Sequence, residues 1–335
     1  MDPTAGTLKL LASGLSTRVV DFGRPATRSL GVAVGGAADR RSLALGNGLV
    51  GNPPDAAALE VTLGGPTLQA TTPLACVLFG APFDLGSERR RLTAGTTFTL
   101  GAGETLRIGG ALRGTRAYLC LRGGIRTPLV LGSRSSLAPL GAGAELPCLA
   151  GTIHGRSLRL PPDGDALGDY LAGVAQPPFR LRALAGPQLD WFAPEEFFGG
   201  PRFTVTPAAD RMGLRLLGEP LRVPPRELVS EPVCPGSVQV TRDGQCVVLG
   251  VDGQTIGGYP KVAQVIGADL DLLGQLRPGD RVWFERLEVG EAEGLYRRQR
   301  SALKEWSVRL REGEMFAAPS LVPGGSGKGG PSPHG

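Results

Sequence analysis

The sequence predicts a mainly β fold with some helix, and three observations support this prediction. The 335 residues are 41% apolar, which is enough to build a core in one large domain or in two of ordinary size. The chain has 52 glycines and 29 prolines without a collagen-like period, a composition typical of many short strands joined by turns. Runs of β character recur along the chain, so we expect a barrel or a sandwich.

In the first part of the chain, one helix is expected among several strands. The pattern at 17–20 predicts a strand, and the polar loop 21–24 follows it. Asp39 belongs to the residue types that cap helix N-termini, so a helix is expected over roughly 40–50, where the Gly-Asn-Pro-Pro run at 51–54 ends it. Further strands are expected at 59–63, 74–79, 96–100, 105–108 and 116–121.

The second part repeats this β-rich character and then changes to helix. We expect strands at 203–205, 214–217 and 281–286, a hairpin joining 237–241 to 245–251 through the turn Arg242-Asp243-Gly244, and a short helix near 269–276. After Gly290 the spacing is helical, and it predicts a narrow apolar stripe of Leu295, Leu303, Trp306 and Leu310.

The boundary between the two parts is expected within 141–178, which is rich in Gly, Pro and Ala and has weak periodicity. The last residues are of low complexity, which is typical of disorder. The predicted organisation is a first β-barrel half over 1–160, a linker over 161–178, a second β-barrel half over 179–288, a C-terminal helix over 289–318 and a disordered tail over 319–335.

Composition argues against two classes of partner. The net charge of +5 comes from interspersed charges with only short basic clusters, so no nucleic-acid partner is expected. No run approaches the roughly 20 apolar residues of a membrane span. The five cysteines form no CxxC pair, which fits reduced thiols, and we expect a soluble, cytoplasmic protein.

Several common kinds of catalytic site are also disfavoured. Only two histidines are present, His154 and His334, which argues against a histidine base, a Ser-His-Asp triad and a His-rich metal site. We therefore predict no metal site. The Gly-Lys pair near residue 328 lacks the first Gly of a Walker A motif, and the GxG pairs lack the third Gly of a dinucleotide fingerprint.

The best remaining candidate for a site is the loop from Asp252 to Lys261. The pair Gly257-Gly258 allows unusual backbone angles and a close approach of the backbone to a ligand. Lys261 suits a polarising or proton-transfer role, because burial can lower the pKa of a lysine. The alternative is an ordinary loop between two strands, with Lys261 on the surface.

Polar side chains in and near this loop could bind an amide or a carboxylate. Ser230 and Gln239 lie upstream on adjoining strands that folding could bring to the same end of a barrel. The residues with suitable donors and acceptors in the loop itself are Asp252, Gln254, Thr255 and Tyr259. Alternatively, Gln254 and Thr255 satisfy a turn and Tyr259 packs on the core.

Three arginines are candidates for anion recognition, because a guanidinium can hold a carboxylate or phosphate with two parallel hydrogen bonds. They are Arg24, Arg134 and Arg211. The alternative for each is a solvated ion pair.

Seven ordered motifs together resemble the biotin-dependent carboxyltransferase-like family, over residues 14–286. This family includes the C subunit of bacterial 5-oxoprolinase, the Kip inhibitor antagonist KipA, and part of the carboxyltransferase region of urea carboxylase. The motifs are DFGR at 21–24, GGAADRRSLALGNGLVGN at 35–52, LEVTLGGP at 59–66, LGSRS at 131–135, ADRMG at 209–213, SEP at 230–232 and the stretch 230–284 that contains the candidate loop.

The resemblance implies two cyclophilin-like β-barrel halves and a role as one subunit of an ATP-dependent complex that opens 5-oxoproline to L-glutamate. ATP would be bound by a partner subunit rather than by this chain, and the partners would resemble the A and B subunits of 5-oxoprolinase, the latter KipI-like. With the resemblance, we predict catalytic roles for Asp252 and Lys261, and binding of a small amide substrate by Gln254, Thr255, Gly257, Gly258, Tyr259, Gln239, Ser230, Arg211, Arg24, Ser133 and Arg134.

Two other functions in the same family stay open. One is a biotin-dependent carboxyltransferase that acts on a urea-like amide. None of the four lysines has the Met neighbours of a biotin carrier, so biotin could come only from another chain. The other is a non-catalytic, KipA-type antagonist of a kinase inhibitor, which needs only a binding surface.

Overall fold

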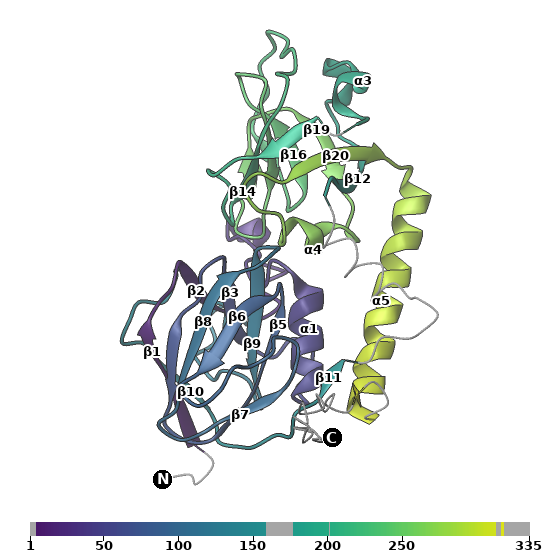
Figure 1. Ribbon diagram of the computed structural model, residues 1–335. Helices are drawn as coiled ribbons and strands as arrows, with labels where there is room; N and C mark the ends of the chain where they lie inside the picture. Colours follow the sequence, from purple (N-terminus) through teal and green to yellow (C-terminus); the bar gives the residue numbers. More distant parts are fainter. Residues whose placement is uncertain (1–4, 159–176, 201, 313–315, 318–335) are drawn as a thin grey trace, which may run out of the picture.

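Two β-rich halves are stacked on one another, and a long helix, α5, runs beside both of them (Figure 1). The computed structural model describes residues 5–158, 177–200, 202–312 and 316–317. The first half lies at the bottom of Figure 1 and the second at the top, with the short helix α4 (Leu270–Leu273) at their junction.

The first half encloses its core between two antiparallel sheets of five strands each. Apolar side chains fill the space between the two sheets. Four that are completely buried are Leu8, Leu68, Leu59 and Leu119. One sheet has the order β10-β1-β4-β8-β6: Glu145–Leu149, Ala5–Ala12, Thr67–Ala70, Thr105–Ala111 and Phe83–Ser87. The other has the order β2-β3-β9-β5-β7: Ser16–Val20, Ala58–Thr62, Arg116–Leu121, Leu74–Gly80 and Phe98–Leu100.

Helix α1 (Arg40–Leu49) packs on the outside of the second of these sheets. Asp39 caps its N-terminus, because its carboxylate accepts a hydrogen bond from the backbone N–H of Ser42 at 3.0 Å. The helix buries Leu43, Leu45 and Leu49 against the sheet, so the predicted helix and its cap are confirmed.

The second half is a closed barrel of seven strands, with a parallel pairing of β12 with β20 among its ladders. Inside it the rings of Phe197 and Phe284 stack with centroids 4.6 Å apart. In ladder order the strands are β12 (Phe179–Ala185), β19 (Lys261–Val265), β16 (Ser237–Val240), β17 (Cys246–Leu249), β14 (Gly213–Leu217), β13 (Phe203–Val205) and β20 (Arg281–Arg286).

Short elements complete the described structure. The strands β15 (Glu231–Pro232) and β18 (Ile256–Gly257) form a ribbon of their own, and β11 (Ser157–Leu158) pairs with β21 (Phe316–Ala317). The remaining helices are the 3-10 turns η1 (Arg28–Leu30) and η2 (Leu189–Trp191) and the single turn α3 (Pro194–Phe197).

Helix α5 (Val289–Glu312) contacts both halves. Near its start, Ala292 is buried beside Ile266 and Ala268 of the second half. Near its end, Trp306 and Leu310 are buried in the apolar cluster that α1 forms with the first half. The predicted apolar stripe therefore packs on the body of the chain itself.

The prediction of a mainly β fold with a C-terminal helix is confirmed, although the strands of the first half form two sheets and those of the second form a closed barrel. The helix ends at Glu312, and Phe316–Ala317 forms a strand instead. Most of the predicted linker and all of the predicted tail lie outside the described residues. Within the described residues, no helix has the length and apolarity needed to cross a membrane.

Candidate functional site

Four residues form a row across the outer face of the second barrel. They are register partners on neighbouring strands: Arg215 on β14 pairs with Val247 on β17, Val247 pairs with Gln239 on β16, and Gln239 pairs with Lys261 on β19. Directly paired residues point to the same side of a sheet. Since the residues flanking Gln239, Val238 and Val240, face the barrel core, this row faces outward.

The candidate loop lies over this row. The ribbon pairs Glu231 with Gly257, which brings the predicted residues of the loop beside Ser230. A Cβ at Gly257 would lie 2.4 Å from Nε2 of Gln239 and 2.8 Å from Nε2 of Gln254, so a larger residue would displace these amides. A Cβ at Gly258 would lie 3.2 Å from Oγ of Ser230.

A cavity of about 230 Å³ opens between the row and the loop, and three predicted substrate-binding residues, Gln239, Gln254 and Tyr259, line it. Gln239 is 2% exposed, and its Nε2 has no hydrogen-bond partner. Its Oε1 lies 3.5 Å from Nε2 of Gln254. The other lining residues are Asp210, Met212, Gly213, Arg215, Thr241, Val247 and Leu249.

Lys261 lies one strand beyond Gln239, and its side chain is buried against Glu231. Its ammonium group forms an ion pair with Oε1 of Glu231, which also accepts a hydrogen bond from Nε2 of Gln188 at 2.9 Å. The amide oxygen of Gln188 accepts the backbone N–H of Lys261 at 2.9 Å. The hydrogen bond from Lys261 holds the pKa of the Glu231 carboxyl below its usual range.

Asp252 and Arg211 lie at the junction of the two halves. Arg211 donates to both carboxylate oxygens of Asp252, at 2.7 and 2.8 Å, and its Nη1 contacts Oε1 of Glu60 on β3 at 2.5 Å. Burial opposes the charge of Arg211, but Glu60 and Asp252 outweigh it and raise the pKa of the guanidinium. One arginine therefore joins the candidate loop to the first half.

Asp21 organises a second cluster, in the first half. Its carboxylate accepts the hydroxyls of Ser133 and Ser135 at 2.6 Å each and the backbone N–H of Arg134 at 2.6 Å. Burial opposes ionisation of Asp21, but these hydrogen bonds prevail and lower its pKa. Beside it, Arg24 is buried and donates to the carbonyl oxygens of Val130 and Ser135.

Gly35 connects the two clusters. A Cβ at this position would lie 3.6 Å from Nη1 of Arg24 and 3.8 Å from Oδ1 of Asp252. The backbone N–H of Gly35 also donates to the carbonyl oxygen of Val251, at the start of the candidate loop. The structure thus brings Arg24 and Asp252, which are more than two hundred residues apart in the printed sequence, to one place.

The predicted site residues therefore form two groups. One group lies at or near the junction of the halves and consists of Arg24, Ser133, Arg134, Arg211 and Asp252. The other group gathers at the outer face of the second barrel and consists of Ser230, Gln239, Gln254, Gly257, Gly258, Tyr259 and Lys261. Thr255 lies in the connecting loop, where its carbonyl oxygen accepts the N–H of Val233.

Sequence reasoning missed three residues that hold this arrangement. Glu60 is buried inside a strand of the first half, and Gln188 precedes a short 3-10 turn, so the residues around them show no pattern typical of a site. Arg28 extends from the first half to the carbonyl oxygens of Gln254, at 3.2 Å, and Val233. Only the Glu of the LEVTLGGP motif could have pointed to one of them.

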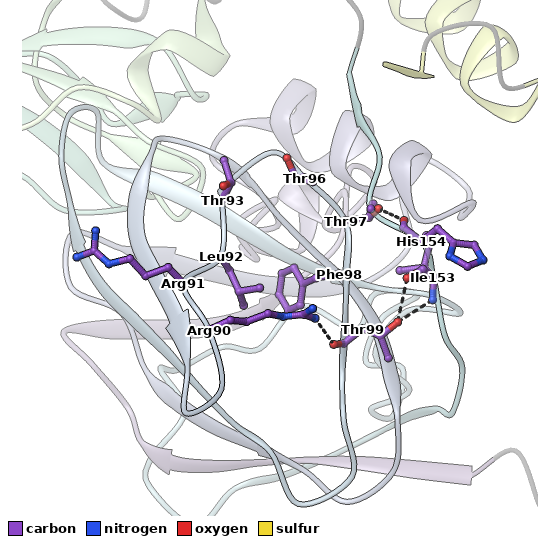
Figure 2. Close-up of a pocket in the computed structure, with 11 residues that line it drawn as sticks. Arg90, Arg91, Leu92, Thr93, Thr96, Thr97, Phe98, Thr99, Ile153 and His154 are labelled. Carbon is purple, nitrogen blue, oxygen red and sulfur yellow. Dashed lines mark hydrogen bonds between the residues drawn. The ribbon is translucent and has the colours of Figure 1, made fainter. Parts of the chain in front are cut away.

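A larger cavity, of about 460 Å³, lies in the first half and contains none of the predicted site residues (Figure 2). Its polar groups are largely satisfied within the chain. Thr97 donates to the carbonyl oxygen of His154, Thr99 donates to that of Ile153, and Arg90 donates to that of Thr99. The smaller cavity, with its unpaired buried amide, is the better candidate for a ligand site.

Known proteins share both the sequence and the fold. The chain is 35% identical over 316 residues to the C subunit of 5-oxoprolinase from Escherichia coli strain K12, which covers 90% of this chain and 98% of that protein. The crystal structure of TTHA0988 superposes with a TM-score of 0.71 at 36% identity, covering 85% of this chain and 57% of that one. The crystal structure of the K. lactis urea amidolyase superposes with a TM-score of 0.78 at 26% identity, covering 95% of this chain and 21% of that one.

The chain thus spans nearly all of the E. coli protein but little over half of TTHA0988 and about a fifth of the amidolyase. These likenesses confirm the resemblance inferred from the motifs. Residues 30–286 also match the sequence profile described as "Carboxyltransferase domain, subdomain A and B". The chain therefore belongs to the family of carboxyltransferase domains with subdomains A and B.

Proposed function

We propose that this chain is a subunit of an ATP-dependent 5-oxoprolinase, which helps open 5-oxoproline to L-glutamate in the cytoplasm. The similarity to the C subunit of 5-oxoprolinase over nearly the full length of both chains supports the proposal. The structural observation that carries it is the unpaired, buried Nε2 of Gln239, a residue that lines a cavity together with Gln254 and Tyr259.

An amide substrate would satisfy this donor. A buried N–H group without a partner costs about 1–3 kcal/mol, and a ligand that supplies an acceptor removes that cost. The carbonyl oxygen of a lactam is such an acceptor. The cavity, of about 230 Å³, suits a small molecule rather than a polymer.

We propose that the ATP chemistry comes from partners resembling the A and B subunits of 5-oxoprolinase. In this scheme the γ-phosphoryl group moves to the lactam oxygen and ADP leaves. Water then adds to the activated carbon and the C–N bond opens, which gives an acyl phosphate and a free amine, and a second water hydrolyses the acyl phosphate to L-glutamate and phosphate. Lys261, paired with Glu231 beside the cavity, is our candidate for proton transfer. Asp252, held by Arg211 on both oxygens, would fix the loop over the substrate.

The experiment that tests this function follows glutamate release from 5-oxoproline and ATP by the three co-expressed subunits. Removal of this chain should abolish the activity. Gln254→Ala should raise the KM for 5-oxoproline, because Gln254 lines the cavity. The control is Gln69→Ala on β4 of the first half, which should leave KM unchanged. Equal activity with and without this chain would disprove the proposal.

The likeness to urea amidolyase favours one second candidate, a carboxyltransferase that transfers a carboxyl group from carboxybiotin to a urea-like amide. Biotin would then be carried by another chain. The discriminating measurement is carboxylation of urea by the assembled subunits in the presence of a biotinylated carrier. Carboxylated urea without glutamate release from 5-oxoproline would favour this candidate.

A further inference from the structure

We propose that the cavity of the second barrel selects a lactam that also bears a carboxylate, and that Arg215 is the residue that recognises the carboxylate. This inference rests on the proposed function and names the substrate features that the site reads. Its basis is the chemical order of the outward row: a cation at Arg215, an apolar side chain at Val247 and a primary amide at Gln239.

The spacing of this row suits a small ligand with two different ends. Arg215 and Gln239 lie on strands separated by one intervening strand, β17, so their backbones are roughly 10 Å apart. Their side chains line the same cavity and shorten the span between the guanidinium and the amide. Val247 lies between them, and Met212 and Leu249 add further apolar wall, which suits the methylene groups of a lactam ring.

The guanidinium of Arg215 is available for a ligand. Its side chain is exposed, and among the described residues no ion pair or hydrogen bond engages it, although Asp243 lies near enough for the two charges to interact. The acid at the same cavity, Asp210, is held by the backbone through one of its oxygens: its Oδ1 accepts the N–H groups of Met212 at 2.8 Å and Gly213 at 3.1 Å. A ligand carboxylate would therefore meet, at this end of the cavity, a guanidinium whose donors make no hydrogen bond within the described residues, with Asp210 and Asp243 as the nearby acids.

The two ends fix the orientation of the substrate. The lactam oxygen would accept a hydrogen bond from the unpaired Nε2 of Gln239, and the carboxylate would accept two parallel hydrogen bonds from Arg215. A urea-like amide offers the first interaction but not the second. Arg215 would accordingly favour 5-oxoproline over a neutral amide of similar size.

The test compares 5-oxoproline with 2-pyrrolidinone, which has the same ring and no carboxylate. With the assembled complex of three subunits, KM and kcat are measured for 5-oxoproline, and Kd is measured by calorimetry for both compounds without ATP. Arg215→Gln should raise KM and Kd for 5-oxoproline about tenfold to a hundredfold, with little change in kcat, because a charged hydrogen-bonded pair is lost. Its Kd for 2-pyrrolidinone should not change.

Two matched variants complete the experiment. Arg222→Gln removes another exposed arginine of the same half that does not line the cavity, and should change neither constant. Arg215→Lys keeps the charge and should recover part of the affinity. If Arg215→Gln leaves both the KM and the preference for 5-oxoproline unchanged while the complex stays active, the inference is wrong and the proposed function survives. If 5-oxoproline binds with this preference but no glutamate forms, the inference about Arg215 is supported and the proposed function is wrong.

Discussion

At the scale of single residues, the surroundings of Gly257 explain why a glycine occupies this position in the loop. Neither Gly257 nor Gly258 adopts a left-handed backbone, so the unusual angles suggested by the glycine pair are not what the fold requires. The requirement is space, because a Cβ at Gly257 would displace the amides of Gln239 and Gln254. The sequence pointed to the correct loop, but the physical reason became visible only with the two side chains in place.

Lys261 gives the prediction at this scale. Lys261→Met keeps most of the side-chain volume and removes the charge, and it leaves Glu231, which is 36% exposed, in contact with water. We therefore expect the chain to fold and assemble normally, with kcat reduced about a hundredfold if Lys261 transfers a proton. The measurement is glutamate release by the complex of three subunits, with assembly followed by size-exclusion chromatography.

Lys304→Met, on the exposed face of α5, is the matched control and should leave kcat unchanged. Unchanged kcat in Lys261→Met would return Lys261 to a purely structural role beside Glu231 and Gln188.

At the scale of elements, α5 joins the two halves through different side chains at its two ends. Its first turns pack on Ile266 and Ala268 of the second half, and its last turns pack on α1. Gly48 of α1 permits the close contact, because a Cβ there would lie 2.6 Å from Cδ1 of Leu310. The helix therefore contributes apolar burial to both halves (Figure 1).

Trp306→Ala tests this contribution. Trp306 is 3% exposed, and truncation of a buried aromatic side chain to alanine costs about 3 to 5 kcal/mol. We expect a loss of that size in the free energy of unfolding, measured by urea denaturation followed by circular dichroism. Val308→Ala on the same helix, where the side chain is 36% exposed, should cost far less. Equal effects of the two variants would show that α5 is only loosely attached.

Local signals in the sequence predicted many elements but missed others, among them the strands β1, β4, β6, β10, β12 and β19. The cap at Asp39 and the hairpin turn at 242–244 are encoded within a few residues, and both stand as expected. The strand β1 was not predicted, although burial alternates along it with Leu8 and Leu10 inside, because this alternating run is short. Its place is set by pairing with β4 and β10, which are distant in the chain.

At the scale of the whole molecule, the junction between the halves is a buried network of charges. Oε1 of Glu60 contacts Nη1 of Arg211 at 2.5 Å and Nε of Arg116 at 3.5 Å, and its Oε2 accepts the hydroxyl of Tyr118 at 2.9 Å. Nearby, Arg41 of α1 pairs with Asp271 of the second half at 2.7 Å. Such pairs join segments far apart in the sequence, so no local pattern could predict that the candidate loop is anchored to the first half.

Glu60→Gln tests this anchoring through stability. Burial opposes the charge of Glu60, but Arg211 and Arg116 outweigh it and lower the pKa of the carboxyl below its ordinary 4.5. A carboxyl with a lowered folded-state pKa stabilises the protein above its unfolded pKa, and this contribution is lost as the pH falls through the folded value. At neutral pH we expect Glu60→Gln to reduce the free energy of unfolding by about 3 to 5 kcal/mol, because buried Arg116 loses its carboxylate partner and buried Arg211 loses one of its two.

The difference between wild type and Glu60→Gln should shrink as the pH falls below 4.5, since the unfolded chain then takes up a proton at Glu60 while the folded protein does so only at lower pH. Urea unfolding of both proteins at neutral and acidic pH measures this difference in stability. The control is Glu145→Gln, which breaks the ion pair with Lys9 on the surface, where the side chains are 43% and 59% exposed, and should cost at most about 1 kcal/mol. A Glu60→Gln variant as stable as the Glu145→Gln control would mean that the buried charges do not hold the halves together, and that the candidate loop is positioned by its backbone contacts alone.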